Sequence, residues 1–262
     1  MEEARLIIDP PATGAWNMAV DQALLETANR TGQMTLRFYQ WSEPTLSLGY
    51  FQSHLERESH PPSRQCAMVR RKTGGGAIMH DRELTYSLCV PSQNRWSSKN
   101  TELYESIHQV IIDLLAEFEI GCKLFKDVDP TAEIRNSMPK IRQNAFMCFE
   151  RRSPGDIVLD GYKIVGSAQR RAKNALLQHG SILLHHSMHA PTLMGLNDLT
   201  NFSLNVAQTV EKLCKDVTNR LRTVLNHGKL SHLEQSTVAG IFESTFNSVS
   251  YTHLTLPTIL LV

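Results

Sequence analysis

The stretch from Cys148 to Gly180 constrains the fold more than any other part of the chain. Asp160-Gly161 separates two β-prone runs, Ile157–Leu159 and Tyr162–Val165. Asp-Gly between such runs is typical of a two-residue β-hairpin, because both central positions of that turn need positive φ. The sequence therefore predicts a hairpin that places Lys163 just after a tight turn.

Alternation along the second strand of this hairpin decides what lies beside Lys163. Successive side chains of a strand point to opposite faces, so we expect Lys163 to share a face with Val165 and Ser167, and Gly166 to lie on the other face. A lysine in this position either extends its ammonium into solvent or is held in a pocket. Gly166 and Gly180 favour the pocket, because a backbone without side chains lets a ligand or another strand approach closely.

Length and composition indicate a globular protein without a strong charge bias. The chain has 262 residues, a formal net charge of +1 and 41% hydrophobic residues. This length predicts one domain, residues 1–250, that can bury a substantial core. Near-neutral charge gives no reason to expect nucleic acid as a partner. No apolar run approaches the ~20 residues needed to span a bilayer, so we expect no membrane segment.

The cysteines and the two ends of the chain predict a cytoplasmic protein. The first residues are acidic and precede a proline pair, unlike a secretion signal. The five cysteines are odd in number, widely spaced and form no CxxC pair, so we expect neither a disulfide framework nor a metal site. We also expect a monomer. Residues 251–262 are apolar and uncharged, and predict either an edge segment or sequence foreign to the natural protein.

Apolar periodicity predicts further helices and strands. Helical spacing predicts helices at 15–28, 103–118 and 206–221, and a last helix that begins at a Ser231–Glu234 capping box. Extended patterns predict strands at 34–41, 45–50, 66–70, 85–90 and 176–185. The stripe of the first helix includes Trp16. Residues 54–65 should form a surface loop or short helix, and residues 121–147 a long connection to Cys148.

A glycine-rich segment follows a pair of arginines in the first half of the chain. Residues 74–76 are three consecutive glycines between Arg70-Arg71 and an apolar strand that ends at His80. The amide groups of such a backbone can bind carboxylate, carbonyl or phosphate oxygens. The spacing fits neither a P-loop nor a dinucleotide fingerprint. The segment is either a flexible surface hairpin or a ligand-binding loop, and the basic residues around it favour the second interpretation.

Cys148 is the candidate nucleophile. Most unpaired cysteines are small buried hydrophobic residues. Here, however, Phe149 follows directly, Arg151 and Arg152 come next, and Lys163 lies fifteen positions further on. An ammonium near a thiol favours the thiolate, which is the reactive form. We therefore expect Cys148 and Lys163 to lie close together in the fold.

Five segments, taken in order, resemble the biotin/lipoate protein ligase and acyltransferase superfamily. They are WNMAVDQALLE, YQWSEPTLSLGYFQ, VRRKTGGGAIMHDRELTYS, DGYKIVGSAQRR and LLQHGSILL, and they span roughly residues 14–185. Within this superfamily the chain most resembles the octanoyltransferases of the type found in Gram-positive bacteria. Those enzymes carry an acyl-accepting cysteine in a Cys-Phe step upstream of the lysine of a DGxKIVGSAQ motif. Cys148-Phe149 and Lys163 match these positions.

The resemblance implies an α+β fold of mixed β-sheets flanked by helices, with an acyl tunnel under the glycine-rich loop. It implies an enzyme that takes an octanoyl group from acyl carrier protein onto Cys148 as a thioester. The acceptor would be a lysine of a lipoyl domain, from a dehydrogenase E2 subunit or the glycine cleavage H protein. Lys163 would stabilise the thiolate, backbone amides near Ser167 would steady the oxyanion, and no cofactor is implied. The residues expected to line the site are Arg70, Arg71, Gly74, Gly75, Gly76, His80, Gly166, Ser167, Ala168, His179 and Gly180.

The charge around the hairpin bears on the carrier protein. Residues 150–173 contain six Lys/Arg against three Asp/Glu, a local excess of +3. A basic rim would attract an acidic carrier protein, whereas a mixed solvated surface would have no such role.

Three alternatives remain open within this resemblance. A lipoate-protein ligase would use ATP and Mg²⁺ to make lipoyl-AMP, and its form of the loop is close to RRKTGGGA. Such a ligase needs no cysteine, and the chain ends before the extra C-terminal domain of long ligases. A related transferase moves octanoyl groups between lipoyl domains, but its cysteine lies elsewhere. A non-catalytic acyl-binding module is the third, and the presence of Cys148 and Lys163 disfavours it.

Overall fold

A computed structural model describes residues 1–128, 141–200 and 202–246. The larger of two sheets contains β1 (Glu2–Ile8), β2 (Thr35–Tyr39), β6 (Glu83–Pro91), β7 (Lys123–Leu124), β8 (Ile157–Leu159), β9 (Tyr162–Ala172), β10 (Ala175–Leu183) and β11 (Thr223–His227). The smaller sheet contains β3 (Thr45–Leu48), β4 (Ala67–Arg70) and β5 (Ile78–His80). The helices are α1 (Gly14–Thr31), α2 (Asn100–Ala116), α3 (Leu196–Leu199), α4 (Val206–Leu221) and α5 (His232–Ile241).

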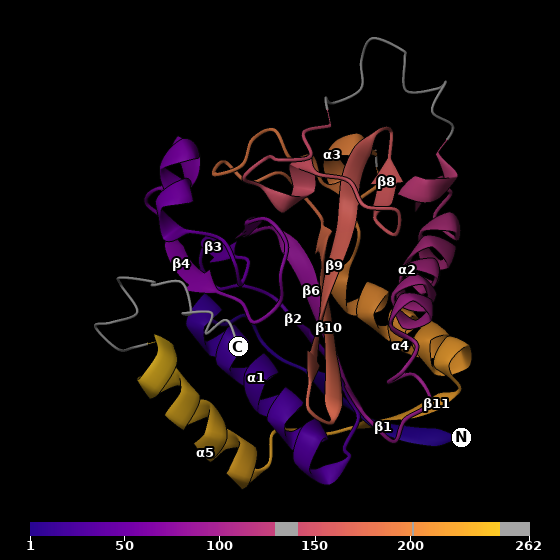
Figure 1. Ribbon diagram of the computed structural model, residues 1–262. Coiled ribbons are helices and arrows are strands. Elements are labelled where there is room, and N and C mark those ends of the chain that lie inside the picture. Colours follow the sequence, from indigo (N-terminus) through magenta and orange to yellow (C-terminus); the bar gives the residue numbers. More distant parts are fainter. Residues whose placement is uncertain (129–140, 201, 247–262) are drawn as a thin grey trace.

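The large sheet is mixed and has helices on both faces. Its strands follow the order β11-β1-β2-β6-β10-β9-β8-β7, in which β1 is parallel to both of its neighbours and the other pairs are antiparallel. Figure 1 shows α1 and α5 on one face of this sheet and α2 and α4 on the other. The small sheet, in the order β4-β3-β5, lies beside α1. The expected α+β arrangement of mixed sheets flanked by helices is confirmed.

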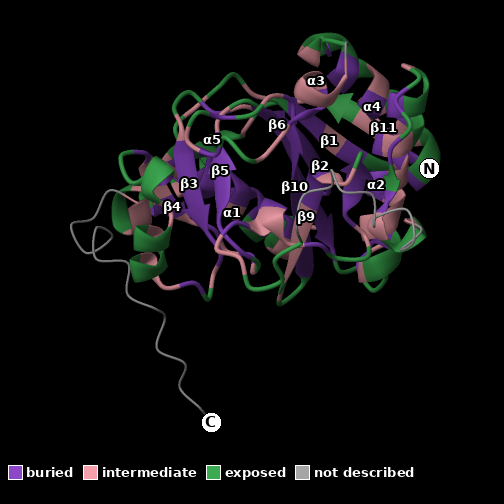
Figure 2. Cartoon of the chain, turned by 90° about the horizontal axis from the view of Figure 1, so that it is seen from above, coloured by how far each residue is buried: buried purple, intermediate pink, exposed green. Residues whose placement is uncertain are grey.

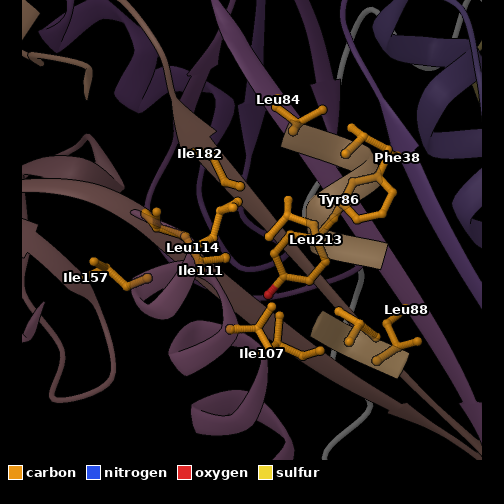
Figure 3. Packing of buried hydrophobic residues seen from close by; sticks show 14 of the residues in the cluster. Phe38, Leu84, Tyr86, Leu88, Ile107, Ile111, Leu114, Ile157, Ile182 and Leu213 are labelled. Carbon is orange, nitrogen blue, oxygen red and sulfur yellow. The ribbon is translucent and has the colours of Figure 1, made fainter. Parts of the chain in front are cut away.

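Two apolar layers hold the helices to the sheet. The larger layer packs α2 and α4 against β6 and its neighbours, and Figure 3 shows Ile107 and Ile111 of α2 beside Tyr86 of β6, with Leu213 of α4. The second layer packs α1 and α5 against the opposite face. Seen from above, the strands are largely buried, while the exposed residues lie on the outer loops and on the outer helices (Figure 2). The close-packed strands are thus a rigid support for the side chains on the loops.

Helix ends follow the local sequence signals. Thr13 caps α1 by accepting the backbone N–H of Trp16, and Gly32 ends that helix with a φ of 78°. The predicted Ser231–Glu234 capping box opens α5. The prediction that Trp16 belongs to the buried stripe is wrong: its side chain is 38% exposed and meets Phe242 edge to face.

The connections agree in part with the sequence. Residues 54–65 form two short 3-10 helices, His54–Ser59 and Pro61–Ser63, as expected for this surface segment. The segment 121–147 was expected to be a plain connection, but it contributes β7 to the edge of the large sheet. Residues 251–262, for which an edge segment or foreign sequence was expected, lie outside the described residues. Across the described residues, no helix is both long and apolar enough to cross a membrane.

Candidate active site

The predicted hairpin is present, with Asp160 and Gly161 at its tip. Their φ angles are 49° and 79°, so both are positive, as a two-residue turn of this kind requires. Leu159 pairs with Tyr162 across the turn. Lys163 is therefore the second residue of β9, at a position that the turn fixes.

A β-bulge one residue later overturns the expected alternation. Val158 pairs with Lys163 but Ile157 pairs with Val165, so Ile164 is an extra residue in β9. An extra residue shifts every following side chain to the opposite face. A Cβ added to Gly166 would lie 2.8 Å from Lys163 Nζ. The prediction that Lys163 shares its face with Val165 and Ser167 is wrong, and its neighbour on that face is Gly166.

Cys148 and Lys163 lie close together, as expected. The Nζ atom of Lys163 is 3.7 Å from the Sγ atom of Cys148. Two backbone hydrogen bonds hold Cys148 in position. The N–H of Cys148 donates to the carbonyl oxygen of Ala77 at 2.7 Å, and the N–H of Ala77 donates to the carbonyl oxygen of Phe146 at 2.9 Å. These two bonds fasten the cysteine segment to the end of the glycine-rich loop.

Asp156 completes this pair and was missed by the sequence analysis. Its Oδ2 atom lies 2.8 Å from Lys163 Nζ, and both side chains are buried. The backbone N–H of Ser153 donates to the same oxygen at 2.7 Å, which orients the carboxylate. The ring of Phe149 lies 5.2 Å from Nζ. The ammonium is thus placed between a carboxylate and the cysteine sulfur.

Two side chains of α2 support the loop that carries Asp156. His108 Nδ1 lies 2.7 Å from the carbonyl oxygen of Gly155, and its Nε2 lies 2.6 Å from Ser167 Oγ. Because a carbonyl can only accept, Nδ1 carries the proton and Nε2 accepts from the Ser167 hydroxyl. Burial lowers the pKa of His108 to about 3. The backbone N–H of Ser167 donates to Tyr104 Oη at 3.2 Å, so this amide, which was expected to steady an oxyanion, already has a partner.

A cavity of about 280 Å³ lies against Cys148 and Lys163. Most of the expected residues line it, and these are Arg71, Gly74, Gly75, His80, Gly166, Ser167, Ala168, His179 and Gly180. The lining also contains side chains that no sequence signal singled out, and these are Met18, Tyr39, Trp41, Ile78, Thr85, Ser153, Asp156, Gln169 and Ser181.

Two expected residues lie outside the cavity lining. Arg70 directs its guanidinium to the carbonyl oxygens of Gly49, Tyr50 and Gln52 and so fixes the turn after β3. Gly76 packs against the cysteine segment, where an added Cβ would lie 3.0 Å from the backbone nitrogen of Cys148. Both residues therefore stabilise backbone segments next to the site without lining the cavity.

The floor of the cavity is a row of small residues across the sheet. Gly166 of β9 pairs with Ser181 of β10, Ser181 with Thr85 of β6, and Thr85 with Tyr39 of β2. Three strand spacings make this row about 14 Å long. Tyr39 belongs to an apolar cluster with Met18 and Trp41. The cavity thus runs from the cysteine end over small side chains to an aromatic end.

One buried carboxylate accepts hydrogen bonds from the hydroxyl groups along this floor. Glu83 Oε1 accepts from Thr85 at 2.5 Å, from Ser181 at 2.8 Å and lies 2.7 Å from His80 Nδ1. The His80 ring stacks on Trp41 with ring centres 3.8 Å apart, and burial lowers the pKa of His80. Because the hydroxyl groups are turned to Glu83, mainly carbon atoms are left to line the cavity.

The glycine-rich loop is anchored at both ends. Thr73 Oγ1 lies 2.6 Å from His179 Nε2. Arg71 donates to the carbonyl oxygens of Gly74 and Gly76, both at 2.7 Å, and burial lowers the pKa of this guanidinium to about 10. These bonds exclude the flexible surface hairpin. Arg71 Nε is buried and has no partner among the described residues, which leaves one donor beside the cavity.

The basic excess of residues 150–173 is smaller at the surface than in the sequence. Lys163 is buried against Asp156, and Arg152 is buried with its guanidinium on the carbonyl oxygens of Phe149 and Gly161. Arg171 and Lys173 are exposed at the far end of β9. Two of the six basic residues are therefore interior, and two others are exposed at the end of β9 away from the Asp160-Gly161 turn.

Comparison with solved structures identifies the fold. The chain is similar to lipoate-protein ligase A bound with ATP, with a TM-score of 0.73, 18% sequence identity and coverage of 96% of this chain and 98% of that one. It is also similar to a bipartite lipoate protein ligase from Thermoplasma acidophilum, studied with its E2 lipoyl domain, with a TM-score of 0.71, 17% identity and coverage of 99% and 100%. At these identities the likeness shows the fold alone.

Relatives found by sequence have a higher identity to this chain than these solved structures do. Proteins named Octanoyltransferase LipM are 38% identical over 190 residues in Halalkalibacterium halodurans (70% of this chain, 67% of that protein) and 33% identical over 223 residues in Bacillus anthracis (75% and 78%). The Staphylococcus aureus protein of this name is 40% identical over 174 residues, which cover 64% of this chain and 61% of that protein. The matched stretch therefore spans less than two thirds of the staphylococcal relative.

The match to a family covers most of the chain. Residues 13–234 match the lipoyl protein ligase A/B catalytic domain. The resemblance drawn from the five sequence segments, including the likeness to octanoyltransferases within the superfamily, is confirmed. The chain belongs to the lipoyl protein ligase A/B catalytic domain family.

Proposed function

We propose that this protein is an octanoyltransferase of lipoate biosynthesis, which moves an octanoyl group from acyl carrier protein through a thioester on Cys148 to a lysine of a lipoyl domain. The relatives named octanoyltransferases support the reaction class. The observation that carries the mechanism is the position of the Lys163 ammonium, 3.7 Å from the sulfur of Cys148 and beside an elongated cavity.

The first half-reaction loads the cysteine. The Cys148 thiolate, stabilised by the Lys163 ammonium, adds to the carbonyl carbon of the donor thioester. The bond between that carbon and the donor sulfur then breaks, and the leaving sulfur takes a proton from Lys163. The products are octanoyl-Cys148, a neutral Lys163 and the free thiol of the carrier. Arg71 lines the same cavity and has a buried Nε–H without a partner among the described residues, so it is our candidate donor to the oxyanion.

The second half-reaction transfers the octanoyl group from Cys148 to the acceptor. The neutral amine of the lipoyl-domain lysine adds to the octanoyl thioester, and the bond to the Cys148 sulfur breaks. Lys163 takes the proton that the amine loses, which restores the ammonium and the thiolate. Asp156 keeps Lys163 in place through both steps, as an ion pair with the ammonium and as a hydrogen-bond acceptor from the neutral amine, because the two side chains are buried 2.8 Å apart. The thioester supplies the driving force, so the proposed reaction uses no cofactor.

The cavity suits the acyl chain. With a C–C bond of about 1.5 Å, an extended eight-carbon chain is about 10 Å long, shorter than the row from Gly166 to Tyr39. Small side chains along the row leave room, and their hydroxyl groups are bound to Glu83. The chain would lie over this row with its carbonyl carbon at Cys148.

The acceptor is a lipoyl domain in this proposal, from an E2 subunit or the glycine cleavage H protein. One structural neighbour is a lipoate protein ligase studied together with an E2 lipoyl domain, which supports this class of partner. The five cysteines are unpaired, which fits the reducing cytoplasm in which we place the reaction.

A transfer assay tests the function. Purified protein is incubated with octanoyl-acyl carrier protein and a lipoyl domain, without ATP, and the mass of the lipoyl domain is followed. We expect the mass of one octanoyl amide to appear. Modification that requires ATP and free octanoate or lipoate would instead identify a ligase, and no modification under either condition would leave an acyl-binding module.

A further inference from the structure

A second cavity shares Lys163 with the first. It measures about 310 Å³ and is lined by Arg142, Phe149, Glu150, Arg152, Tyr162, Lys163, Thr192, Leu193 and Met194. Phe149 lines the second cavity, forms an apolar cluster with Ile78 of the first cavity and has Leu193 of the second packed against it. Cys148 packs on the same cluster. The cysteine thus lies where the two cavities approach each other.

The lining of the second cavity combines apolar and cationic groups. Phe149, Leu193 and Met194 supply the apolar part. The charged residues of the lining are Arg142, Arg152, Lys163 and Glu150. Asp156 of the first cavity neutralises Lys163, so one positive charge is left over. Arg152 and Lys163 are buried, whereas Arg142 is exposed and stands at the solvent side. Such a lining fits a long flexible ligand with a reactive inner end and an anionic outer end.

We propose that this second cavity binds the phosphopantetheine arm of the octanoyl donor, with the thioester at Cys148 and the phosphate at Arg142. The inference rests on the proposed function. If the octanoyl chain fills the first cavity, the donor sulfur and everything attached to it must leave the reaction point in another direction. Lys163 lines both cavities, so the proton that the leaving sulfur needs is available from the wall of this one.

Two small donors measure the contribution of the phosphate to acylation. S-octanoyl-phosphopantetheine and S-octanoyl-pantetheine differ by that group alone, and their rates of acylation of Cys148 are compared by rapid quenching and intact mass. We expect wild-type protein to prefer the phosphorylated donor about tenfold or more, as for a hydrogen bond to a charged group. Arg142→Ser should lose the preference while acylation by S-octanoyl-pantetheine stays within about twofold. Arg220→Ser, an exposed arginine of α4, is the matched control and should keep the preference.

A blocked cavity gives a second, independent measurement. Thr192 is exposed at the rim, so Thr192→Trp should fill the cavity without disturbing the core. Acylation by S-octanoyl-phosphopantetheine should fall about tenfold or more, because the arm no longer fits. Acylation by p-nitrophenyl octanoate, whose leaving group is small, should stay within about twofold.

The outcomes separate this inference from the function on which it rests. No acylation of the wild-type protein by octanoyl-acyl carrier protein or by any of the three small donors would contradict the proposed function itself. Equal acylation by the two pantetheine donors, or a preference that survives Arg142→Ser, would overturn only the arm site. Coenzyme A and acyl carrier protein carry the same arm, so Arg142→Ser should slow acylation from both octanoyl donors. Slower acylation from the carrier protein alone would place Arg142 against the protein and would also overturn the proposal.

Discussion

Lys163 and Asp156 form an ion pair that is closed to solvent, with Nζ and Oδ2 2.8 Å apart and their side chains 4% and 2% exposed. A buried ammonium without a partner is costly, so this carboxylate is what allows a lysine to occupy the site at all. The same ammonium lies 3.7 Å from the sulfur of Cys148. The geometry therefore links the stability of the hairpin to the chemistry of the cysteine.

Asp156→Asn should reduce acylation of Cys148 at least about tenfold, because the amide no longer holds the ammonium beside the sulfur. The substitution also breaks a buried pair, and should lower the free energy of unfolding by about 3–5 kcal/mol. Single-turnover acylation and urea denaturation measure the two effects. Asp160→Asn at the exposed hairpin tip should change neither. Acylation by Asp156→Asn at the wild-type rate would show that the carboxylate plays no part.

Gly166→Ala should slow acylation about tenfold or more while the protein stays folded. The added Cβ would lie 2.8 Å from Lys163 Nζ, closer than real side chains approach, so the lysine must leave the position in which Nζ is 3.7 Å from the sulfur. Gly121→Ala is the control, since a Cβ there meets nothing within 4 Å. Thermal unfolding confirms the fold, and single-turnover acylation measures the effect. Equal rates for the two variants would mean that the position of Lys163 is not critical.

Met18→Ala should shift the preferred donor from octanoyl towards decanoyl. Met18 closes the aromatic end of the cavity with Tyr39 and Trp41, and one methylene in an apolar pocket changes selectivity by about 10- to 200-fold. Competition among hexanoyl, octanoyl and decanoyl carrier proteins, with acyl-enzymes resolved by mass, gives the preference. Trp16→Ala, half-exposed on the same helix, should leave it unchanged. An unaltered preference in Met18→Ala would place the end of the chain elsewhere.

His108→Asn should make the protein less sensitive to mild acid. The pKa of His108 is about 3 in the folded protein, against an ordinary value near 6.5, so below pH 6.5 the unfolded chain binds the additional proton. Its contribution to stability is complete above pH 6.5 and falls by about 2 kcal/mol by pH 5. Urea denaturation at pH 7.5 and 5 should show a difference smaller by that amount in His108→Asn than in wild type. His232→Asn, an exposed control, should behave as wild type, and the same pH dependence in His108→Asn would refute the assignment.

Local signals in the sequence predicted much of the fold. Asp160-Gly161 predicted the hairpin because the turn geometry depends on two residues alone, and the Ser231–Glu234 box predicted the start of α5 for the same reason. The bulge at Ile164 could not be foreseen, since Ile164 and Val165 are both apolar and both fit the core. Pairing of β1 with β11 joins residues more than 200 positions apart in the sequence, such as Arg5 and Asn226.

The sequence predicted the site residues with reactive side chains, but not those that reach the site only through the packing of the fold. Cys148 and Lys163 carry reactive groups, and the effect of an ammonium on a nearby thiol predicted that they lie close together, as the structure confirms. Asp156 precedes a strand in a loop of turn-forming residues, where an aspartate has many ordinary roles. Met18 and Tyr39 come from separate elements and reach the cavity only through the order of strands in the sheet.

The central claim is the thioester on Cys148, and intact mass spectrometry tests it most directly. Wild-type protein and Cys148→Ser are each incubated with octanoyl-acyl carrier protein in the absence of ATP, and a lipoyl domain is then added. We predict one octanoyl adduct on the wild-type protein, its loss when the lipoyl domain is added, and no thioester adduct on Cys148→Ser. An adduct that persists unchanged in Cys148→Ser, or octanoylation of the lipoyl domain by that variant at the wild-type rate, would contradict the account.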